Sequence, residues 1–402
     1  MSWPLKPLSE LCLLAVDCVN KTAPLVEGPT PYKMIRTTNV KGGFIDTKTV
    51  RYVSEATFEQ WTRRSKPQYG DVILTREAPV GEVGRCTFDE TEQIFLGQRL
   101  FQYRPDPDLL DWNFLAYALQ SPQLQSKLHG ISFGVTVPHI KVGDAEHLEI
   151  PCPSLETQKT IGEILATYDD LIENNQRRIA LIDESARLIY REWFVRFRHP
   201  GHEGSTSSAL PVGWTTVPLR EVATVNRASL GTKDAPGQIR YIDIASVSTG
   251  VVTEFKQMHY LEAPGRARRL VQHGDVIWSC VRPNLRSFAL LWEPGEDVVV
   301  STGFAVLSAK QVPFSYLYLA TTTDDFVSHL SNVATGAAYP AVSGKDFEAA
   351  PLLVPSLDVL QDFDERCLPL LELTSNLARQ NVELLEARNS WLPRLMSGEI
   401  AV

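Results

Sequence analysis

Four segments from the first half of the chain recur in the second half, in the same order. The clearest pair is YGDVILTREAP, at 69–79, with HGDVIWSCVRP, at 273–283. The longest pair is GVTVPHIKVGDAEHLEIPCPSLETQ, which begins at Gly134, with GAAYPAVSGKDFEAAPLLVPSLDVL, which begins at Gly336. The other two are IRTTNVKGG with IDIASVSTG and PLSE with PLRE. An internal repeat of this length predicts two copies of one architecture rather than a single large domain.

The repeat divides the chain into two similar domains, each followed by one long helix. Apolar runs bounded by Gly, Pro, Asn and Asp, such as GDVIL and VVVSTGFAVL, predict strands, whereas DWNFLAYALQSPQLQSKLHG has helical spacing. The expected fold class is α+β, with two mixed α/β domains, two long helices between them and pseudo-twofold symmetry. The expected boundaries are 1–153 for the first domain, 154–198 for the first helix, 199–213 for a Gly-, Ser- and Pro-rich linker, 214–355 for the second domain and 356–397 for the second helix.

The stretch 155–199 is the longest helical pattern in the chain, with no proline and a single glycine, Gly162. Steps of four and three residues from Ile161 to Trp193 meet an apolar or aromatic side chain at nine of ten positions. Charged residues, Asp169 among them, flank this seam and are predicted to form a solvated back. The pattern indicates a helix that packs along its length against another helix.

The second long helix carries a matching but weaker seam, which Thr374, Asn381 and Arg388 interrupt. Two seams in one chain most economically pack on each other, so we predict an intramolecular antiparallel coiled coil. Asn175 and Asn381 lie one on each seam. They either fix the register of the pair or lie solvated at its edge, and both interpretations stay open.

The net charge of -9 argues against nonspecific binding of polyanions through bulk charge, so DNA binding would require a locally basic face. Six cysteines are scattered without a C-x-x-C pair, which indicates reduced thiols rather than a zinc site or a disulfide scaffold. The apolar run LCLLAV, at 11–16, is too short for a signal peptide or a membrane span. We therefore expect a cytoplasmic protein that does not bind membranes.

Several phrases taken together resemble those of one protein family. They are GDVILT followed by GEVG, FLGQRLFQYRP, IPCPSLETQKTIGEIL, LIYREWFVRF, STGFAVL, GAAYP, LLVPSL and WLPRLMSGEI. With the doubled organisation, they make the whole chain similar to the specificity subunit of type I restriction-modification systems. The second helix departs from the pattern, because it begins LDVLQDFDERC where the first begins LETQKTIGEI. Whether both helices dock partners equally stays open.

The resemblance implies a noncatalytic subunit that reads double-stranded DNA in phage defence. Each domain would be a target-recognition domain for one half of a bipartite, asymmetric site, and the helices would set the gap. The first seam is roughly 48 Å long at ~1.5 Å per residue, which is on the order of 14 base pairs. The implied partners are two adenine methyltransferase subunits and a translocase/nuclease subunit. The resemblance places S-adenosylmethionine, ATP and Mg²⁺ in those partners and no cofactor in this chain.

Basic clusters beside the repeated GDVI phrase are the first candidates for DNA contact. They lie in WTRRSKPQYGDVILTRE and in PGRARRLVQHGDVIWSCVRPNLRS, so corresponding places in the two halves offer cations for phosphates. The alternative is a solvated surface cluster. The candidate residues are Arg63, Arg64, Lys66, Arg76, Arg266, Arg268, Arg269, Arg282 and Arg286, together with Asn284, whose amide is compatible with reading adenine.

Three polar turns, RTTNVKGG, GVTVPHIK and GAAYPAVSGK, are the second candidates. Their side chains are suited to bases or phosphates, although the small residues equally suit tight turns without any ligand. The candidate residues are Arg36, Thr37, Asn39, Lys41, Thr136, His139, Lys141, Tyr339 and Lys345.

No catalytic or metal-binding residue is predicted. The chain lacks both the NPP or DPP motif of a DNA methyltransferase and the G-x-x-x-x-G-K-[ST] motif of a motor. Asp243, Glu254 and Lys256 have the residue types of a metal-dependent nuclease, but the first half has no equivalent. His199 and His202 lie in the linker and are expected to be solvated.

Two alternative functions remain open. One is a scaffold whose domains bind protein, which the acidic net charge favours. The other is a DNA-binding protein that has no methyltransferase partner.

Overall fold

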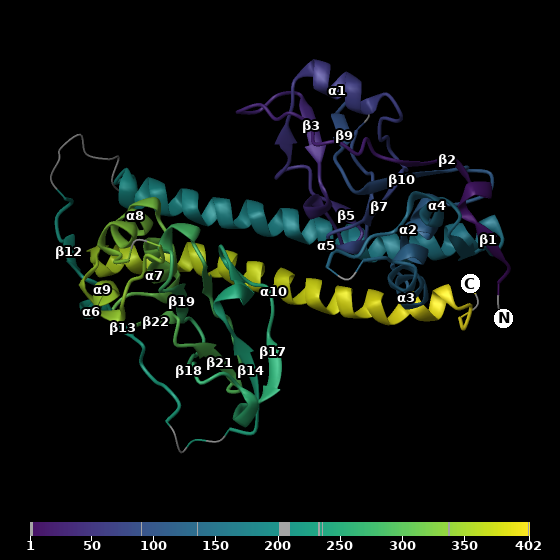
Figure 1. The fold of residues 1–402 in the computed structure, drawn as a ribbon. Helices are drawn as coiled ribbons and strands as arrows, with labels where there is room; N and C mark the ends of the chain where they lie inside the picture. The colour runs from purple at the N-terminus through teal and green to yellow at the C-terminus, as the bar shows by residue number, and fades with distance from the viewer. Residues whose placement is uncertain are drawn as a thin grey trace. The chain divides into compact units, whose positions relative to one another are not determined.

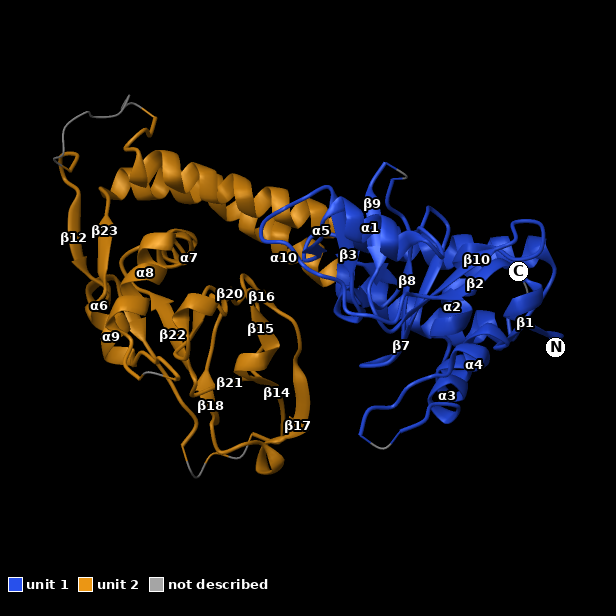
Figure 2. Cartoon of the chain, turned by 45° about the horizontal axis from the view of Figure 1, so that its top comes forward, with its two compact units in different colours: residues 1–174, 381–402 blue, residues 175–380 orange. Residues whose placement is uncertain are grey.

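The computed structural model describes most of the chain (Figure 1). The described residues are 3–89, 91–134, 136–200, 210–231, 234, 236–336, 338–400 and 402. The chain divides into two compact units: unit 1 contains residues 1–174 and 381–402, and unit 2 contains residues 175–380 (Figure 2). Most of the predicted linker, 199–213, lies outside the described residues, and so does His202.

A four-stranded antiparallel sheet forms the centre of unit 1, with the strand order β2-β10-β7-β8. Strand β7, with the sequence VILTR, has four successive buried residues because it has neighbours on both sides. The strands of this sheet are β2 (Cys12–Asp17), β10 (Leu100–Pro105), β7 (Val72–Arg76) and β8 (Val80–Arg85). Smaller sheets join β1 (Leu5–Pro7) to β11 (Glu149–Pro151), β4 (Val40–Lys41) to β5 (Phe44–Ile45), and β3 (Tyr32–Ile35) to β6 (Arg51–Tyr52) and, in parallel, to β9 (Gln93–Leu96).

Unit 2 contains a four-stranded antiparallel sheet with the order β13-β22-β19-β20. Val276 pairs with Leu290 across β19 and β20, as Val72 pairs with Arg85 across β7 and β8. The strands are β13 (Ala223–Val225), β22 (Phe304–Ala309), β19 (Val276–Ser279) and β20 (Phe288–Leu290). A second sheet holds β17 (Lys256–His259), β14 (Gln238–Ile242), β21 (Val298–Ser301) and β18 (Ala267–Leu270), and two pairs join β12 (Thr215–Pro218) to β23 (Pro351–Val354) and β15 (Val247–Ser248) to β16 (Val251–Val252).

Polar side chains cap the short helices that cover these sheets. Asp111 accepts a hydrogen bond from the first turn of α2 (Trp112–Gln120), and Ser121 does so for α3 (Pro122–Gly130). In unit 2, Thr323 caps α8 (Asp324–Val333) in the same way. The other short helices are α1 (Glu55–Thr62), α4 (Val142–Glu146), α6 (Leu219–Val222), α7 (Phe314–Thr321) and α9 (Gly344–Ala349), and the 3-10 turns are η1 (Leu8–Glu10), η2 (Thr37–Asn39), η4 (Ile244–Ser246), η5 (Tyr260–Glu262) and η6 (Pro283–Leu285).

Two long helices, α5 (Leu155–Tyr190) and α10 (Leu357–Met396), each contribute to both units. Helix α5 continues into a π-helical turn, Arg191–Val195. The glycine of α5, Gly162, lies against α2, where a Cβ would come within 2.6 Å of the Asp111 carboxylate. Glycine is therefore required by a close approach of two helices. In the part of the chain that the structure describes, no helix has the length and apolarity that a membrane crossing needs.

Both long helices pack on the hydrophobic core of each unit. In unit 1, Ile161 and Leu165 of α5 share one cluster of buried residues with Leu395 of α10. In unit 2, the rings of Tyr190, at the end of α5, and Phe363, near the start of α10, have centroids 6.2 Å apart. In unit 1 the two helical segments run in opposite directions, because Asp169 bonds to Arg388 whereas Ile161 and Leu165, earlier in α5, pack in one cluster with Leu395, later in α10.

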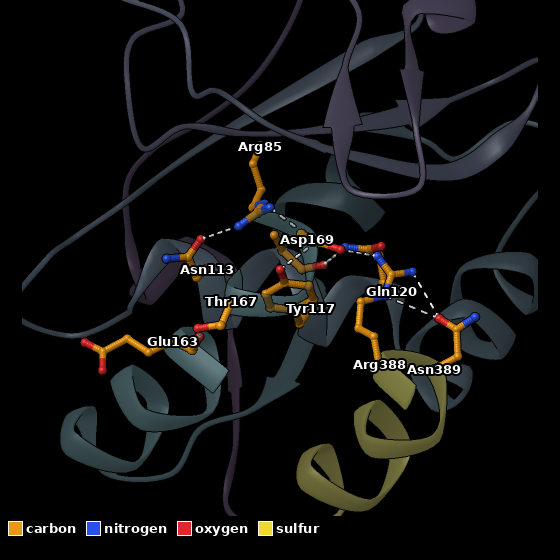
Figure 3. A network of polar contacts seen from close by, with 10 residues as sticks. Arg85, Asn113, Tyr117, Gln120, Glu163, Thr167, Asp169, Arg388 and Asn389 are labelled. Carbon is orange, nitrogen blue, oxygen red and sulfur yellow. Dashed lines mark hydrogen bonds and ion pairs between the residues drawn. The ribbon is translucent and has the colours of Figure 1, made fainter. Parts of the chain in front are cut away.

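One prediction about the first helix is wrong. Asp169 was assigned to the solvated back of α5, but it is fully buried, while its neighbour Asp170 is exposed. Arg388, which interrupts the apolar seam of α10, is the reason, because its guanidinium donates to Asp169 Oδ1 at 2.6 Å (Figure 3). Two residues that each break an apolar pattern are therefore paired with each other inside unit 1.

Candidate nucleic-acid interface

Three of the predicted segments of unit 1 meet at the turn between β7 and β8. Thr37 Oγ1 donates to the carbonyl of Ala78 at 3.1 Å, and the amide of Ile140 donates to the carbonyl of Arg76 at 2.9 Å. His139 forms an antiparallel bridge with Glu77. These contacts bring the turn 36–41, the end of β7 and the loop 133–141 together at one edge of unit 1.

The loop 133–141 is a short hairpin with an exposed tip. Phe133 and His139 exchange backbone hydrogen bonds of 2.9 and 2.8 Å, and Gly134 makes the reversal possible with a φ of 103°. Lys141 Nζ lies 3.9 Å from the centroid of the Phe133 ring. Thr136, His139 and Lys141 are all exposed, so the hairpin presents an aromatic ring, a cation and polar groups to solvent.

Unit 2 has a corresponding hairpin at 335–341. Thr335 and Ala341 exchange two backbone hydrogen bonds of 2.9 Å, and Gly336 again has a φ of 103°. The guanidinium of Arg282 lies 4.7 Å from the ring centroid of Tyr339, whose side chain is 70% exposed. A cation stacked on an exposed aromatic ring thus occurs at both hairpins, at the base of the first (Phe133 with Lys141) and on Tyr339 within the second. Such pairs suit nucleic acid, because the ring can stack on a base while the cation approaches a phosphate.

Two of the predicted side chains in the turn 36–41 are used by the fold itself. The amide of Asn39 is buried, accepts from the backbone of Arg36 and donates to Thr49, so it is not free to meet a base. Thr37 is held by Ala78, as described above. Lys41, on β4, is the exposed cation of this segment.

The residues with nuclease-like chemistry also have a structural role. Asp243 caps η4 through Ser246, and its other oxygen accepts from Lys256 Nζ at 2.6 Å, while Glu254 lies 3.9 Å from the same nitrogen. Partial burial opposes ionisation of Asp243, but the hydrogen bonds from Lys256 and Ser246 outweigh it and hold its pKa below the usual value. Among the described residues, no group of three or more His, Cys, Asp or Glu side chains has the arrangement of a metal site.

The proteins with related sequences that we compared are type I restriction specificity subunits. Residues 19–184 match the type I restriction modification DNA specificity domain. Over 366 residues the chain is 23% identical to the type I restriction enzyme MjaIX specificity subunit of Methanocaldococcus jannaschii, which covers 88% of this chain and 82% of that protein. It is 21% identical over 394 residues to the EcoKI specificity subunit of Escherichia coli, which covers 91% of this chain and 82% of that protein. Residues 19–184 therefore match a DNA specificity domain, and most of the chain is similar to type I restriction specificity subunits.

The fold agrees with this family. The crystal structure of a type I restriction-modification S subunit from M. genitalium superposes with a TM-score of 0.58 at 17% identity, and the match covers 98% of this chain and 96% of that one. The prediction of a mixed α/β protein with a long helix is therefore confirmed.

In unit 1, the basic cluster around the start and end of β7 is divided among several intramolecular contacts. Arg64 forms an ion pair with Asp17, and Lys66 donates to Gln93 at 3.1 Å. Arg63 is exposed. Arg76 is half-buried, and its Nε and Nη1 atoms are buried without a hydrogen-bond partner. Arg63 thus remains accessible to a phosphate, whereas Arg64 and Lys66 already have partners.

The basic cluster of unit 2 is similarly divided. Arg268 packs on Tyr260 and donates to its hydroxyl, and Arg269 donates to Ser229 at 3.2 Å. Arg286 pairs with Asp324. The predicted residues of unit 2 that are exposed are Arg266, Arg282, Asn284, Tyr339 and Lys345.

The residues that hold the segments together were missed by the sequence reasoning. Asp169, Arg85 and Tyr117 form a buried polar cluster next to Gly43 in the turn after β4. A charged residue on an apolar seam, Arg388, was the one available signal. It indicated that a buried partner of opposite charge was needed, but it did not identify that partner.

Proposed function

We propose that this specificity subunit is a noncatalytic DNA reader in which each unit contacts one half of a bipartite, asymmetric site. The two corresponding hairpins, each with a cation stacked on an exposed aromatic ring, are the observation that carries the proposal. Repeated surface chemistry on two units of one chain is what two half-sites require. Different residues at the two hairpins then allow two different half-sequences to be read.

The DNA contacts we propose are the exposed members of the predicted set. Cations bind phosphates and fix the register, while amide, imidazole and aromatic groups meet bases. In unit 1 they are Lys41, Arg63, Thr136, His139 and Lys141, and in unit 2 they are Arg266, Arg282, Asn284, Tyr339 and Lys345. The remaining predicted residues, which are Arg36, Thr37, Asn39, Arg64, Lys66, Arg76, Arg268, Arg269 and Arg286, would support these contacts from within each unit.

The long helices set the gap between the half-sites in this proposal. The recurring strand orders, the matched hairpins and the opposed helix segments of unit 1 support a pseudo-twofold repeat joined by an antiparallel coiled coil. The same helices would dock two methyltransferase subunits that bind S-adenosylmethionine. A translocase/nuclease subunit that uses ATP and Mg²⁺ would complete the assembly, and this chain itself would hold no cofactor.

Mapping adenine methylation tests the function directly. The chain together with its methyltransferase partner should methylate adenines within a two-part site, and the isolated chain should methylate nothing. Methyl transfer by the isolated chain would refute the noncatalytic role.

A matched pair of variants tests the hairpins. Arg282→Ala removes an exposed cation, whereas Arg286→Ala removes one that already pairs with Asp324. We expect Arg282→Ala to weaken duplex binding and to lower the salt dependence by about one phosphate contact. Equal effects of the two variants would contradict the proposed contact.

The acidic net charge supports a second candidate, a scaffold whose two units bind proteins. It predicts that Lys141→Ala and Arg282→Ala leave duplex binding unchanged. A third candidate is a DNA-binding protein without a methyltransferase partner. In that case Lys141→Ala and Arg282→Ala would weaken duplex binding, but a pull-down from the host would recover no methyltransferase.

A further inference from the structure

A buried carboxylate in unit 1 joins four elements of the chain. Asp169, on α5, accepts hydrogen bonds from Tyr117 Oη of α2 at 2.6 Å, Arg85 Nη2 of β8 at 3.2 Å and Arg388 Nη1 of α10 at 2.6 Å (Figure 3). Asp169 is 0%, Arg85 4% and Arg388 7% exposed. We call these four residues the Asp169 cluster.

Further contacts fix the orientation of the two guanidinium groups. Arg85 Nη1 donates to Asn113 Oδ1 at 2.9 Å, and Arg388 Nη2 donates to Asn389 Oδ1 at 3.0 Å. The guanidinium of Arg85 also lies 5.3 Å from the centroid of the Tyr117 ring. Charged groups held from several sides have little freedom to rotate, so the cluster defines one arrangement of these elements.

The Asp169 cluster lies directly beneath the hairpin of β4 and β5. Gly43, in this hairpin, has a φ of 95°, and a Cβ there would come within 3.3 Å of the Gln120 amide and 3.6 Å of Asp169 Oδ2. Gly43 accepts from the amide of Arg85 at 3.0 Å and donates to Val83 at 2.9 Å. Arg85 therefore contacts Asp169 with its side chain and holds the hairpin with its backbone amide.

Unit 2 fills the corresponding positions with apolar side chains. Leu290 takes the place of Arg85 in the strand register, and the repeat places Leu319, Leu371 and Ala186 where unit 1 has Tyr117, Asp169 and Arg388. Leu319, Leu371 and Ala186 are buried in one hydrophobic cluster. The same place can thus be packed without charge, and burial alone does not explain the Asp169 cluster.

Unit 2 nevertheless places a polar group beneath its own hairpin. Gly250, between β15 and β16, has a φ of 79°, and a Cβ there would come within 3.3 Å of the hydroxyl of Tyr318. Arg187, on α5, donates to that hydroxyl at 3.4 Å and to Thr322 at 3.0 Å. Both units therefore connect a long helix to a glycine hairpin, through a carboxylate in unit 1 and through a guanidinium in unit 2.

We propose that Asp169 is a positioning residue for DNA reading: it holds the hairpin Val40–Ile45, and with it the turn 36–41, in place on the helices. The inference rests on the proposed DNA-reading function. It assigns to the long helices a role in reading as well as in spacing, because the carboxylate that fixes the hairpin belongs to α5. It also predicts that reading in the two halves can be disturbed separately.

The first test uses the full chain with its methyltransferase partner and a library of duplexes randomised at both half-sites. Asp169→Asn keeps the shape of the side chain and removes its charge, and Asp170→Asn is the matched control on the exposed neighbour. We expect Asp169→Asn to reduce base discrimination about tenfold in one half-site, the equivalent of one base contact, and to leave the other half unchanged. No change, or equal losses in both halves, would overturn the proposal.

A second variant separates positioning from stability. The combination Arg85→Leu, Tyr117→Leu, Asp169→Leu and Arg388→Ala copies the apolar residues that unit 2 has at the four positions, so we expect it to melt close to the wild type. Discrimination in the affected half-site should still be lost. Full discrimination in this variant would show that packing is sufficient and would refute the role of the charge.

Hydrogen exchange gives a readout that needs no DNA. In Asp169→Asn the Gly43 amide, which donates to Val83, should exchange about tenfold faster, with no change in Asp170→Asn. Unaltered exchange in both variants would overturn the proposal even if DNA reading is confirmed. A wild-type complex without any sequence preference would instead refute the proposed function, and the exchange result would stand by itself.

Discussion

Replacing Arg388 by alanine should destabilise unit 1 and leave unit 2 unchanged. Arg388 is buried, and its guanidinium donates to Asp169 Oδ1 at 2.6 Å. The substitution leaves the Asp169 carboxylate in place without one of its two cationic partners. A buried charge that has lost a partner cannot be solvated instead, because the site is closed to water.

The magnitude follows from the contacts that remain. Removing one partner from a buried ion pair typically costs about 3–5 kcal/mol. Asp169 would keep the donors of Arg85 and Tyr117, so we expect a smaller loss of about 2–3 kcal/mol in the free energy of unfolding. Arg394→Ala is the matched control, because Arg394 is on the same helix and its pair with Glu399 is exposed. We expect that control to change stability by less than about 1 kcal/mol.

Urea unfolding followed by hydrogen exchange and mass spectrometry measures the two units separately. Peptides from the sheet of unit 1 should lose protection at lower urea in Arg388→Ala, while peptides from the sheet of unit 2 should follow the wild type. In a double-mutant cycle with Asp169→Leu, the second substitution should cost much less than it does alone. The reasoning would be refuted if Arg388→Ala and Arg394→Ala had the same free energy of unfolding. It would also be refuted if Arg388→Ala destabilised both units equally.

Three further predictions concern single sites. Gly43→Ala should cost about 1–2 kcal/mol in thermal denaturation, because the residue has a positive φ and polar neighbours, whereas Gly130→Ala, with open space around it, should be nearly neutral. The lowered pKa of Asp243 means that its ionised form stabilises unit 2 above the unfolded pKa; the advantage over Asp243→Asn should therefore be present at neutral pH and vanish as pH falls through the folded pKa. Burial raises the pKa of the thiols of Cys280 to about 11 and Cys12 to about 12, so alkylation at pH 8, read by mass spectrometry, should be slow until urea unfolds the chain.

Much of the local structure followed from patterns in the sequence. The apolar run of β7 is bounded by turn residues, and the structure contains a buried strand there. The apolar steps of the first seam predicted residues such as Ile161 and Leu165 on the packed face of α5, and both are fully buried. These features depend on residues that are near each other in the sequence, and periodicity is a pattern among such residues.

The candidate site was less accessible to the same reasoning. The basic residues before β7 formed a convincing cluster in the sequence, yet Arg64 and Lys66 have partners within unit 1. Whether a surface cation is free depends on acidic and amide groups from distant segments, and Asp17 and Gln93 are such groups. The spacing of the basic residues along the chain does not show which distant acidic or amide groups will contact them.

The sequence by itself determined the two long helices and the similarity to type I restriction specificity subunits, because helical periodicity and characteristic phrases are properties of order along the chain. Only the tertiary structure decided the place of Asp169. Its charge and spacing assign it to solvent, and it is buried because Arg85 and Arg388, far from it in sequence, neutralise it in space. Burial of a charge depends on which partners the fold assembles around it, and that assembly exists only once the chain has folded.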